Sequence, residues 1–132
     1  MGRKIMKAYI TCPVSHTNKR LKLLPLIEKV VKAKGLEPLV FTIGGEPADI
    51  FKRDIKALKS SDILIAEASE GSHGVGMEIG LSHCLGLKRI LLVEIGNFVT
   101  KLAQGMPDTT IVEYLDEDDL GNKLGEALDK II

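Results

Sequence analysis

The sequence predicts a doubly wound α/β domain that spans residues 1–132 and has a five-stranded parallel sheet at its centre. Five short apolar runs alternate with segments whose apolar residues recur at helical spacing. Runs such as ILIA at 63–66 and ILLV at 90–93 are apolar at every position, which is typical of strands covered on both faces. A length of 132 residues without a linker or repeat suits one compact domain.

The first half of the chain supplies two strands and two helices. Residues 4–12 form a β-rich first strand, and a second strand is expected at 37–43. A helix is expected at 18–35, with Gly35 as its stop. Its apolar residues at helical spacing are Leu21, Leu24, Ile27, Val30 and Val31. The next helix is expected at 46–61. Its buried face is predicted to carry Ile50, Phe51, Ile55 and Leu58.

The second half continues the alternation. Acidic residues crowd the start of the last helix, where the helix dipole favours them. The expected strands lie at 62–68, 88–95 and 109–115, and the expected helices at about 76–85, 99–105 and 116–132.

Right-handed crossovers favour the strand order 2-1-3-4-5, which is a Rossmann-like or flavodoxin-like arrangement. In such sheets ligands bind at the carboxyl ends of the strands, near the point where the strand order reverses. Here that point lies between strands 1 and 3. We therefore expect the site among residues 11–16 and 67–74.

Composition excludes several classes of partner. Eighteen basic and eighteen acidic residues balance, which argues against binding to a nucleic acid polymer or an anionic membrane. No run approaches 18 apolar residues and none resembles a signal peptide, so a cytoplasmic protein is expected. The cysteines Cys12 and Cys84 and the histidines lack the spacing of a metal site, and no metal is expected.

The glycine-rich stretch at 70–80 does not fit a dinucleotide fingerprint. Its third glycine comes one residue late, and the stretch follows strand 3 instead of strand 1. No cofactor is therefore expected. Gly74 and Gly76 are instead predicted to let the chain turn tightly into a helix, so that Ser72 and nearby backbone amides can meet a phosphate. Ser72 could equally serve only as the helix cap.

Two carboxylates are candidates for chemistry. Glu78 is expected in the first turn of the following helix, where the dipole stabilises the ionised form that a carboxylate nucleophile needs. A helix-capping role is the alternative. Asp54 lies at the edge of its helix's apolar face, where it either has a function or pairs with a nearby Lys or Arg. The loop after strand 1 either faces a phosphate or is a solvated helix start. Its candidates are Ser15, His16, Lys19 and Arg20.

Together these residues resemble a known family. Tyr9, the Arg-Asp pair at 53–54 and the segment SDILIAEASEGSHGVGMEIG at 61–80 are similar to the nucleoside 2-deoxyribosyltransferase superfamily. Residues 69–80 look most like its 2′-deoxynucleoside 5′-monophosphate N-hydrolase branch. The resemblance extends from Tyr9 to about Gly105.

The resemblance implies roles for individual residues. Glu78 would be the nucleophile that forms a covalent deoxyribosyl-enzyme, and Asp54 would help protonate the departing base. Ser72 matches a phosphate-binding serine, and Tyr9 matches a tyrosine that lines the pocket and orients the nucleophile. Thr100 aligns with a hydroxyl residue that a neighbouring subunit lends to the phosphate site, so a homodimer is expected.

The expected function is hydrolysis of the N-glycosidic bond of a small-molecule substrate, a 2′-deoxynucleoside 5′-monophosphate. The loop after Tyr9 departs from the branch's usual glycine-serine loop with an arginine, which leaves its phosphate partners open. The short chain and the absence of an asparagine-bearing C-terminal extension favour a hydrolase. The alternatives are a nucleoside 2-deoxyribosyltransferase and a non-catalytic nucleotide-binding module of the same fold.

Overall fold

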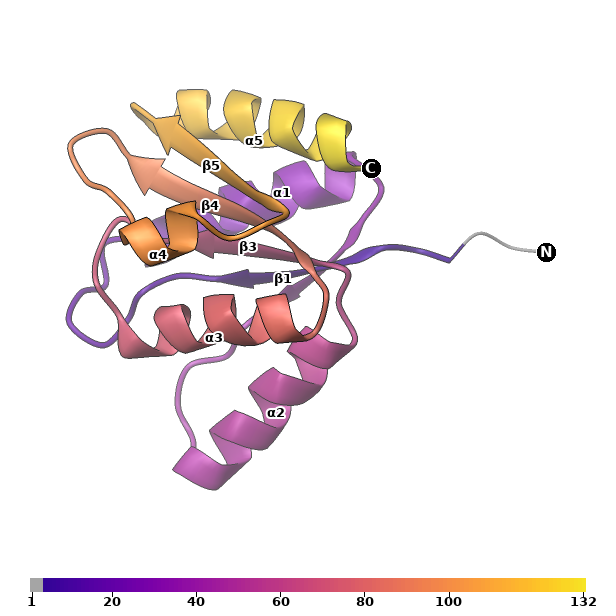
Figure 1. The fold of residues 1–132 in the computed structure, drawn as a ribbon, viewed down its shortest axis with the longest axis vertical. Coiled ribbons are helices and arrows are strands. Elements are labelled where there is room, and N and C mark those ends of the chain that lie inside the picture. Colours follow the sequence, from indigo (N-terminus) through magenta and orange to yellow (C-terminus); the bar gives the residue numbers. More distant parts are fainter. Residues whose placement is uncertain (1–3) are drawn as a thin grey trace.

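The computed structural model describes residues 4–132 and contains a five-stranded sheet in the order β2-β1-β3-β4-β5, with every neighbouring pair parallel (Figure 1). The predicted fold class and strand order are confirmed. The strands are β1 (Lys7–Thr11), β2 (Glu37–Val40), β3 (Ile63–Glu67), β4 (Lys88–Glu94) and β5 (Thr109–Tyr114). The helices are the 3-10 helix η1 (Leu21–Leu23), α1 (Leu24–Ala33), α2 (Pro47–Lys59), α3 (His73–Cys84), α4 (Lys101–Gln104) and α5 (Glu117–Ile131).

Helices cover both faces of the sheet, which explains the continuous apolar character of the central strands. Helices α1 and α5 lie on one side, and α2 and α3 lie on the other (Figure 1). Along β3, Ile63 and Ile65 belong to the core under α1 and α5, while Leu64 and Ala66 belong to the core on the opposite face. Alternate side chains of a strand point to opposite faces, so a strand buried on both sides must be apolar throughout.

Helix α2 packs less completely than its periodicity predicts. Leu58 is buried, but Phe51 is 58% exposed and does not lie in the core. The assignment of Phe51 to a buried face was therefore wrong. In Figure 1 the first turns of α2 extend away from the sheet, and the loop from β2 runs beside them. Periodicity identifies an apolar face without specifying what lies against it.

Helix α3 begins at His73, three residues earlier than predicted. The side-chain oxygen of Ser72 accepts a hydrogen bond from the Val75 amide at 3.3 Å and so caps the helix. Gly74 and Gly76 consequently lie inside the helix, and neither has a positive φ. The prediction that these glycines form the tight turn was wrong, because the cap at Ser72 already supplies the helix start.

Other boundaries differ by a few residues. The segment 18–20, which was predicted to be helical, precedes the short 3-10 helix, and β2 ends at Val40 instead of residue 43. Within residues 4–132 no helix combines the length and the apolar character that crossing a bilayer requires. The division of the chain into one domain over 1–132 stays a prediction.

Candidate active site

Glu78 lies beneath the carboxyl end of β1 and is held there by two hydroxyl groups. The Tyr9 hydroxyl donates to its Oε2 atom at 2.5 Å, and the Thr11 hydroxyl donates to its Oε1 atom at 3.0 Å. Tyr9 and Thr11 are two residues apart on β1, so their side chains point to the same face of the sheet. That face is the one on which α3 lies. Each carboxylate oxygen thus has its own donor from one rigid strand.

The environment of Glu78 differs from the predicted one. Glu78 is the sixth residue of α3 and lies in its second turn, beyond the first turn where the dipole acts most strongly. Burial raises the pKa of Glu78, the hydrogen bonds from Tyr9 and Thr11 lower it, and the nearby charge of Asp54 raises it again, leaving a net increase. The expected first-turn position of Glu78 was therefore wrong. The two hydroxyl donors oppose the effect of burial.

The proton of Tyr9 is firmly held. Burial, together with the adjacent charge and hydrogen bond of Glu78, raises the pKa of the Tyr9 hydroxyl far above its ordinary value. Tyr9 therefore remains a donor to Glu78 at any physiological pH.

Glu78 opens into a cavity of about 480 Å³ between α2, α3 and the loop that follows β2. This volume falls within the range of small-molecule sites. The walls are mainly apolar, and their large side chains include Phe41, Ile43, Ile50, Phe51, Met77 and Leu81. Glu78 and Asp54 are the two carboxylates in the lining, so the cavity places paired acids in an apolar setting.

Asp54 faces this cavity from α2, and its side chain is 24% exposed. The Nε atom of Arg53 lies 3.4 Å from its Oδ1 atom, so the predicted ion pair with a neighbouring cation is present. The same guanidinium donates to the carbonyl oxygens of Thr42 at 2.8 Å and Gly44 at 3.3 Å. Arg53 thereby ties the β2–α2 loop to the helix that carries Asp54. Asp54 thus combines the ion pair with a place at the cavity.

The glycine-rich segment and the loop after β1 both reach the cavity. Ser72 and Gly74 line it on the α3 side, and Ser15 lines it on the β1 side. Gly76 is exposed two residues further along α3 and is outside the lining. His16 is also exposed and outside the lining.

Thr100 lies away from this cavity. It is exposed, and its hydroxyl oxygen accepts a hydrogen bond from the Leu102 amide at 3.3 Å, which caps α4. Its neighbours Phe98 and Leu102 are 84% and 83% exposed. Within one chain, Thr100 is therefore a helix cap beside an exposed apolar surface.

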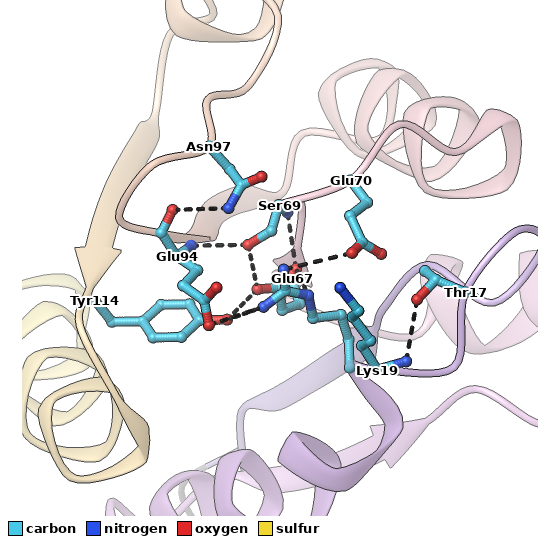
Figure 2. Close-up of polar contacts among 9 residues, drawn as sticks. Thr17, Lys19, Glu67, Ser69, Glu70, Glu94, Asn97 and Tyr114 are labelled. Carbon is cyan, nitrogen blue, oxygen red and sulfur yellow. Dashed lines mark hydrogen bonds and ion pairs between the residues drawn. The ribbon is translucent and has the colours of Figure 1, made fainter.

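Arg20, a candidate for phosphate binding, is committed to a network of carboxylates. It is only 6% exposed. Its Nη1 atom lies 3.2 Å from Glu94, its Nη2 atom 3.5 Å from Glu70, and its Nε atom 3.9 Å from Glu67. Nη1 also lies 3.3 Å from the Tyr114 hydroxyl. Arg20 therefore has a structural role in this chain, and its guanidinium is engaged by carboxylates. Figure 2 shows these acidic groups converging from the ends of β3 and β4.

Ser69 completes the network at the start of the loop to α3. Its amide and hydroxyl donate to the two oxygens of Glu67 at 2.8 and 2.6 Å, and Tyr114 donates to Glu67 as well. The Glu94 amide in turn donates to the Ser69 hydroxyl at 2.8 Å (Figure 2). Lys19 is exposed beside this network. The network fixes both loops that border the cavity, namely the one after β1 and the one after β3.

The predicted site region at 11–16 includes Thr11, but sequence reasoning did not single it out as a partner of Glu78. The available signal was its position two residues after Tyr9 on a predicted strand, which places the two side chains on one face. No group of three or more His, Cys, Asp or Glu residues within 4–132 is arranged to hold a metal ion.

Comparisons with known proteins identify the family of the chain. A scan against models of protein families gives no match. A protein of Thermofilum pendens, whose name assigns it provisionally as a 2′-deoxynucleoside 5′-phosphate N-hydrolase, is 32% identical over 136 residues, covering 93% of this chain and 95% of the relative. A CMP N-glycosidase of Clostridium botulinum superposes with a TM-score of 0.70 at 22% identity, covering 89% of this chain and 97% of that one.

A 2-deoxyribosyltransferase of Bacillus psychrosaccharolyticus superposes with a TM-score of 0.67 at 20% identity, covering 88% of this chain and 90% of that one. At such identities the two solved structures show the fold alone. The identity and coverage of the sequence relative establish that the chain belongs to the 2′-deoxynucleoside 5′-phosphate N-hydrolase family, within the nucleoside 2-deoxyribosyltransferase superfamily. Membership places it with the N-glycosidases, a class of hydrolases.

Proposed function

We propose that this protein hydrolyses the N-glycosidic bond of 2′-deoxynucleoside 5′-monophosphates, releasing the free base and 2-deoxyribose 5-phosphate. The observation that carries the proposal is the carboxylate of Glu78, which two hydroxyl donors orient at the edge of an apolar cavity with Asp54 in its lining. The family relationship supports the same reaction class.

In the first step, a carboxylate oxygen of Glu78 forms a bond to the anomeric carbon while the bond from that carbon to the base nitrogen breaks. The electron pair of the broken bond moves to the base, and Asp54 provides a proton to it. Departure of the base gives the sugar oxocarbenium character, which a facing carboxylate stabilises and then captures. The product of this step is a glycosyl-Glu78 intermediate.

In the second step, water attacks the anomeric carbon and the ester bond to Glu78 breaks. The water's proton passes to Asp54, which restores both carboxyl groups to their starting states. Tyr9 and Thr11 continue to donate to the Glu78 carboxylate as it leaves. Transfer to a second base in place of water would be the reaction of the rival transferase.

The lining suggests how the substrate lies. The phosphate is proposed to meet Ser72 and the backbone amides that begin α3, with Ser15 opposite and Gly74 and Gly76 keeping this end of the helix bare. The base lies against the apolar wall that includes Phe51. His16, exposed in the same loop as Ser15, stays a candidate for the phosphate.

The test of the chemistry is a covalent trap. A 2-fluoro analogue of the deoxynucleotide slows breakdown of the intermediate, and mass spectrometry of proteolytic fragments should find the sugar phosphate on the peptide that contains Glu78. Glu78→Ala should lack both label and turnover. Glu126→Gln, at an exposed glutamate on α5, serves as the matched control. Label on any other residue would reject the assignment of the nucleophile.

A product assay separates the hydrolase from its rivals. Native protein is incubated with a panel of ribo- and deoxyribonucleoside monophosphates and an isotopically labelled free base. Hydrolysis predicts release of base without label in the nucleotide. Label in the nucleotide identifies a transferase, and binding without any released base identifies a non-catalytic module.

We further propose that the active unit is a homodimer to which Thr100 contributes across the interface. The support is the exposed apolar pair Phe98 and Leu102 beside it, since exposed groups of this size often mark an interface. Mixing inactive Glu78→Ala with Thr100→Val should create dimers with one intact site and raise activity above either variant alone. Activity that does not rise, or a monomer in sedimentation, would contradict this arrangement.

A further inference from the structure

Thr11 is one of the two hydroxyl donors to Glu78, and its contribution can be separated from that of Tyr9. It is the last residue of β1, it is 1% exposed, and its hydroxyl donates to Oε1 of Glu78 at 3.0 Å. We propose that Thr11 is a positioning residue, which holds the plane of the Glu78 carboxylate so that the oxygen presented to the substrate is fixed. This inference rests on the proposed function of Glu78 and adds to it the element that aims the nucleophile.

The geometry of the two donors carries the argument. The terminal torsion of a glutamate has a broad energy profile, so one hydrogen bond leaves the carboxylate free to turn about its own axis. Tyr9 and Thr11 engage different oxygens of Glu78 from the same face of one strand. Two donors at fixed separation define a plane, whereas either donor alone defines only a direction.

Thr11 is itself well fixed. Its backbone pairs with Ala66 of β3 in the parallel sheet. Its β-branched side chain has restricted freedom about χ1. The hydroxyl is therefore held by the central strands of the fold.

Charge around the site gives Thr11 a second consequence. Besides Thr11, three groups face Glu78. They are Tyr9 on β1, Cys12 directly after β1, and Asp54 on α2. Burial raises the pKa of Cys12 to about 12, so that thiol is neutral in the working range. Tyr9 and Thr11 are the groups that lower the pKa of Glu78 against burial and the charge of Asp54. Loss of the Thr11 hydroxyl should therefore raise the pKa of Glu78.

A purely structural role for Thr11 makes a different prediction. If the hydroxyl only satisfies a buried polar group, replacing threonine by valine lowers stability but leaves the ionisation and reactivity of Glu78 unchanged. If the hydroxyl positions the carboxylate, the same replacement lowers kcat more than it changes KM. It also moves the acidic limb of the pH–rate profile to higher pH.

The experiment compares Thr11→Val, Thr11→Ser and the control Thr110→Val, which removes a hydroxyl from an exposed position on β5. For Thr11→Val we expect kcat to fall roughly ten-fold, the consequence of one lost hydrogen bond to a charged group. Thr11→Ser keeps the hydroxyl and should stay within about three-fold of the native rate, since only the β-branched restraint is lost.

A measurement independent of turnover accompanies the kinetics. The side-chain carboxyl carbon of Glu78 is titrated by NMR in ¹³C-glutamate-labelled protein and assigned with Glu78→Gln. In Thr11→Val the Glu78 midpoint should lie at higher pH than in native protein, and in Thr11→Ser close to it. Should Thr11→Val fail to fold, Thr11→Ala provides the same comparison with less bulk.

The outcomes separate the two proposals. A native protein that hydrolyses no deoxynucleotide overturns the proposed function, yet the NMR titration still decides whether Thr11 controls Glu78. A Glu78 midpoint in Thr11→Val equal to the native one, or a kcat equal to that of Thr110→Val, overturns the positioning role. A raised midpoint together with a lowered kcat and recovery in Thr11→Ser supports it.

Discussion

Replacement of Arg20 by methionine tests whether the network at the ends of β3, β4 and β5 stabilises the fold. Methionine keeps much of the length and apolar bulk of the arginine stem and removes the guanidinium. Arg20 contacts Glu67, Glu70 and Glu94, and the side chain of Glu67 is fully buried. Removal of the cation therefore leaves an anion without its counter-charge in the interior.

The expected loss of stability comes mainly from Glu67. The pairs with Glu70 and Glu94 involve carboxylates that are 25% and 43% exposed, and such pairs contribute at most about 1 kcal/mol each. Breaking a buried pair costs about 3–5 kcal/mol, because the remaining charge is uncompensated. Ser69 and Tyr114 still donate to Glu67, which favours the lower end of that range. We expect a loss of about 3 kcal/mol in the free energy of unfolding.

Urea unfolding followed by circular dichroism measures this change, with Lys19→Met as the matched control. Lys19 is the adjacent cation and is exposed, so its replacement should change the free energy by less than about 0.5 kcal/mol. Arg20→Lys keeps the charge but not the fork of donors, and should lie between the two. A loss below about 1 kcal/mol for Arg20→Met would refute the reasoning, since Glu67 would then tolerate burial without Arg20.

Three further predictions concern the cavity and α3. Tyr9→Phe removes a hydrogen bond that lowers the pKa of Glu78, so the acidic limb of the pH–rate profile should move to higher pH; an unmoved limb would contradict this. Asp54→Asn should slow hydrolysis about 100-fold. The control Asp49→Asn, at an exposed position on the same helix, should leave the rate unchanged. Equal rates for the two variants would mean that Asp54 only forms its ion pair with Arg53 and has no part in the reaction. Gly76→Ala should raise the free energy of unfolding by about 0.5–1 kcal/mol, because alanine favours a helix more than glycine does and a Cβ at this position meets nothing within 4 Å. Urea unfolding measures this change. A lower free energy of unfolding would contradict the prediction.

The fold could be predicted because its determinants are local and repeated. Apolar runs such as 63–66 can be buried on both faces only in a sheet covered by helices, and that requirement fixes the parallel α/β architecture. The start of α3 was harder to place, because glycines at 74 and 76 are poor helix formers. The cap at Ser72 outweighs that preference.

The polar arrangement of the site was less accessible from sequence. Glu78 and Asp54 could be singled out by motif, but the contacts of Glu78 join residues 67 and 69 positions apart. Arg20 reaches Tyr114 across 94 positions. A loop rich in Ser, His, Lys and Arg indicates a polar function without indicating which members turn inward. That choice depends on the tertiary positions of Glu67 and Glu94, which no local pattern encodes.

Phe51 connects the error in the fold prediction to the proposed chemistry. The periodicity of α2 correctly identifies an apolar face, yet Phe51, Ile43 and Met77 are 58%, 61% and 60% exposed around one cavity. These apolar side chains are exposed to solvent in the free protein. A planar base has a suitable shape to cover them. The same walls bury Glu78 and raise its pKa, so the surface that we propose to hold a base also disfavours the charged form of the proposed nucleophile. The two hydroxyl donors on β1 oppose this effect, because each favours the charged form of the carboxylate that the apolar cavity disfavours.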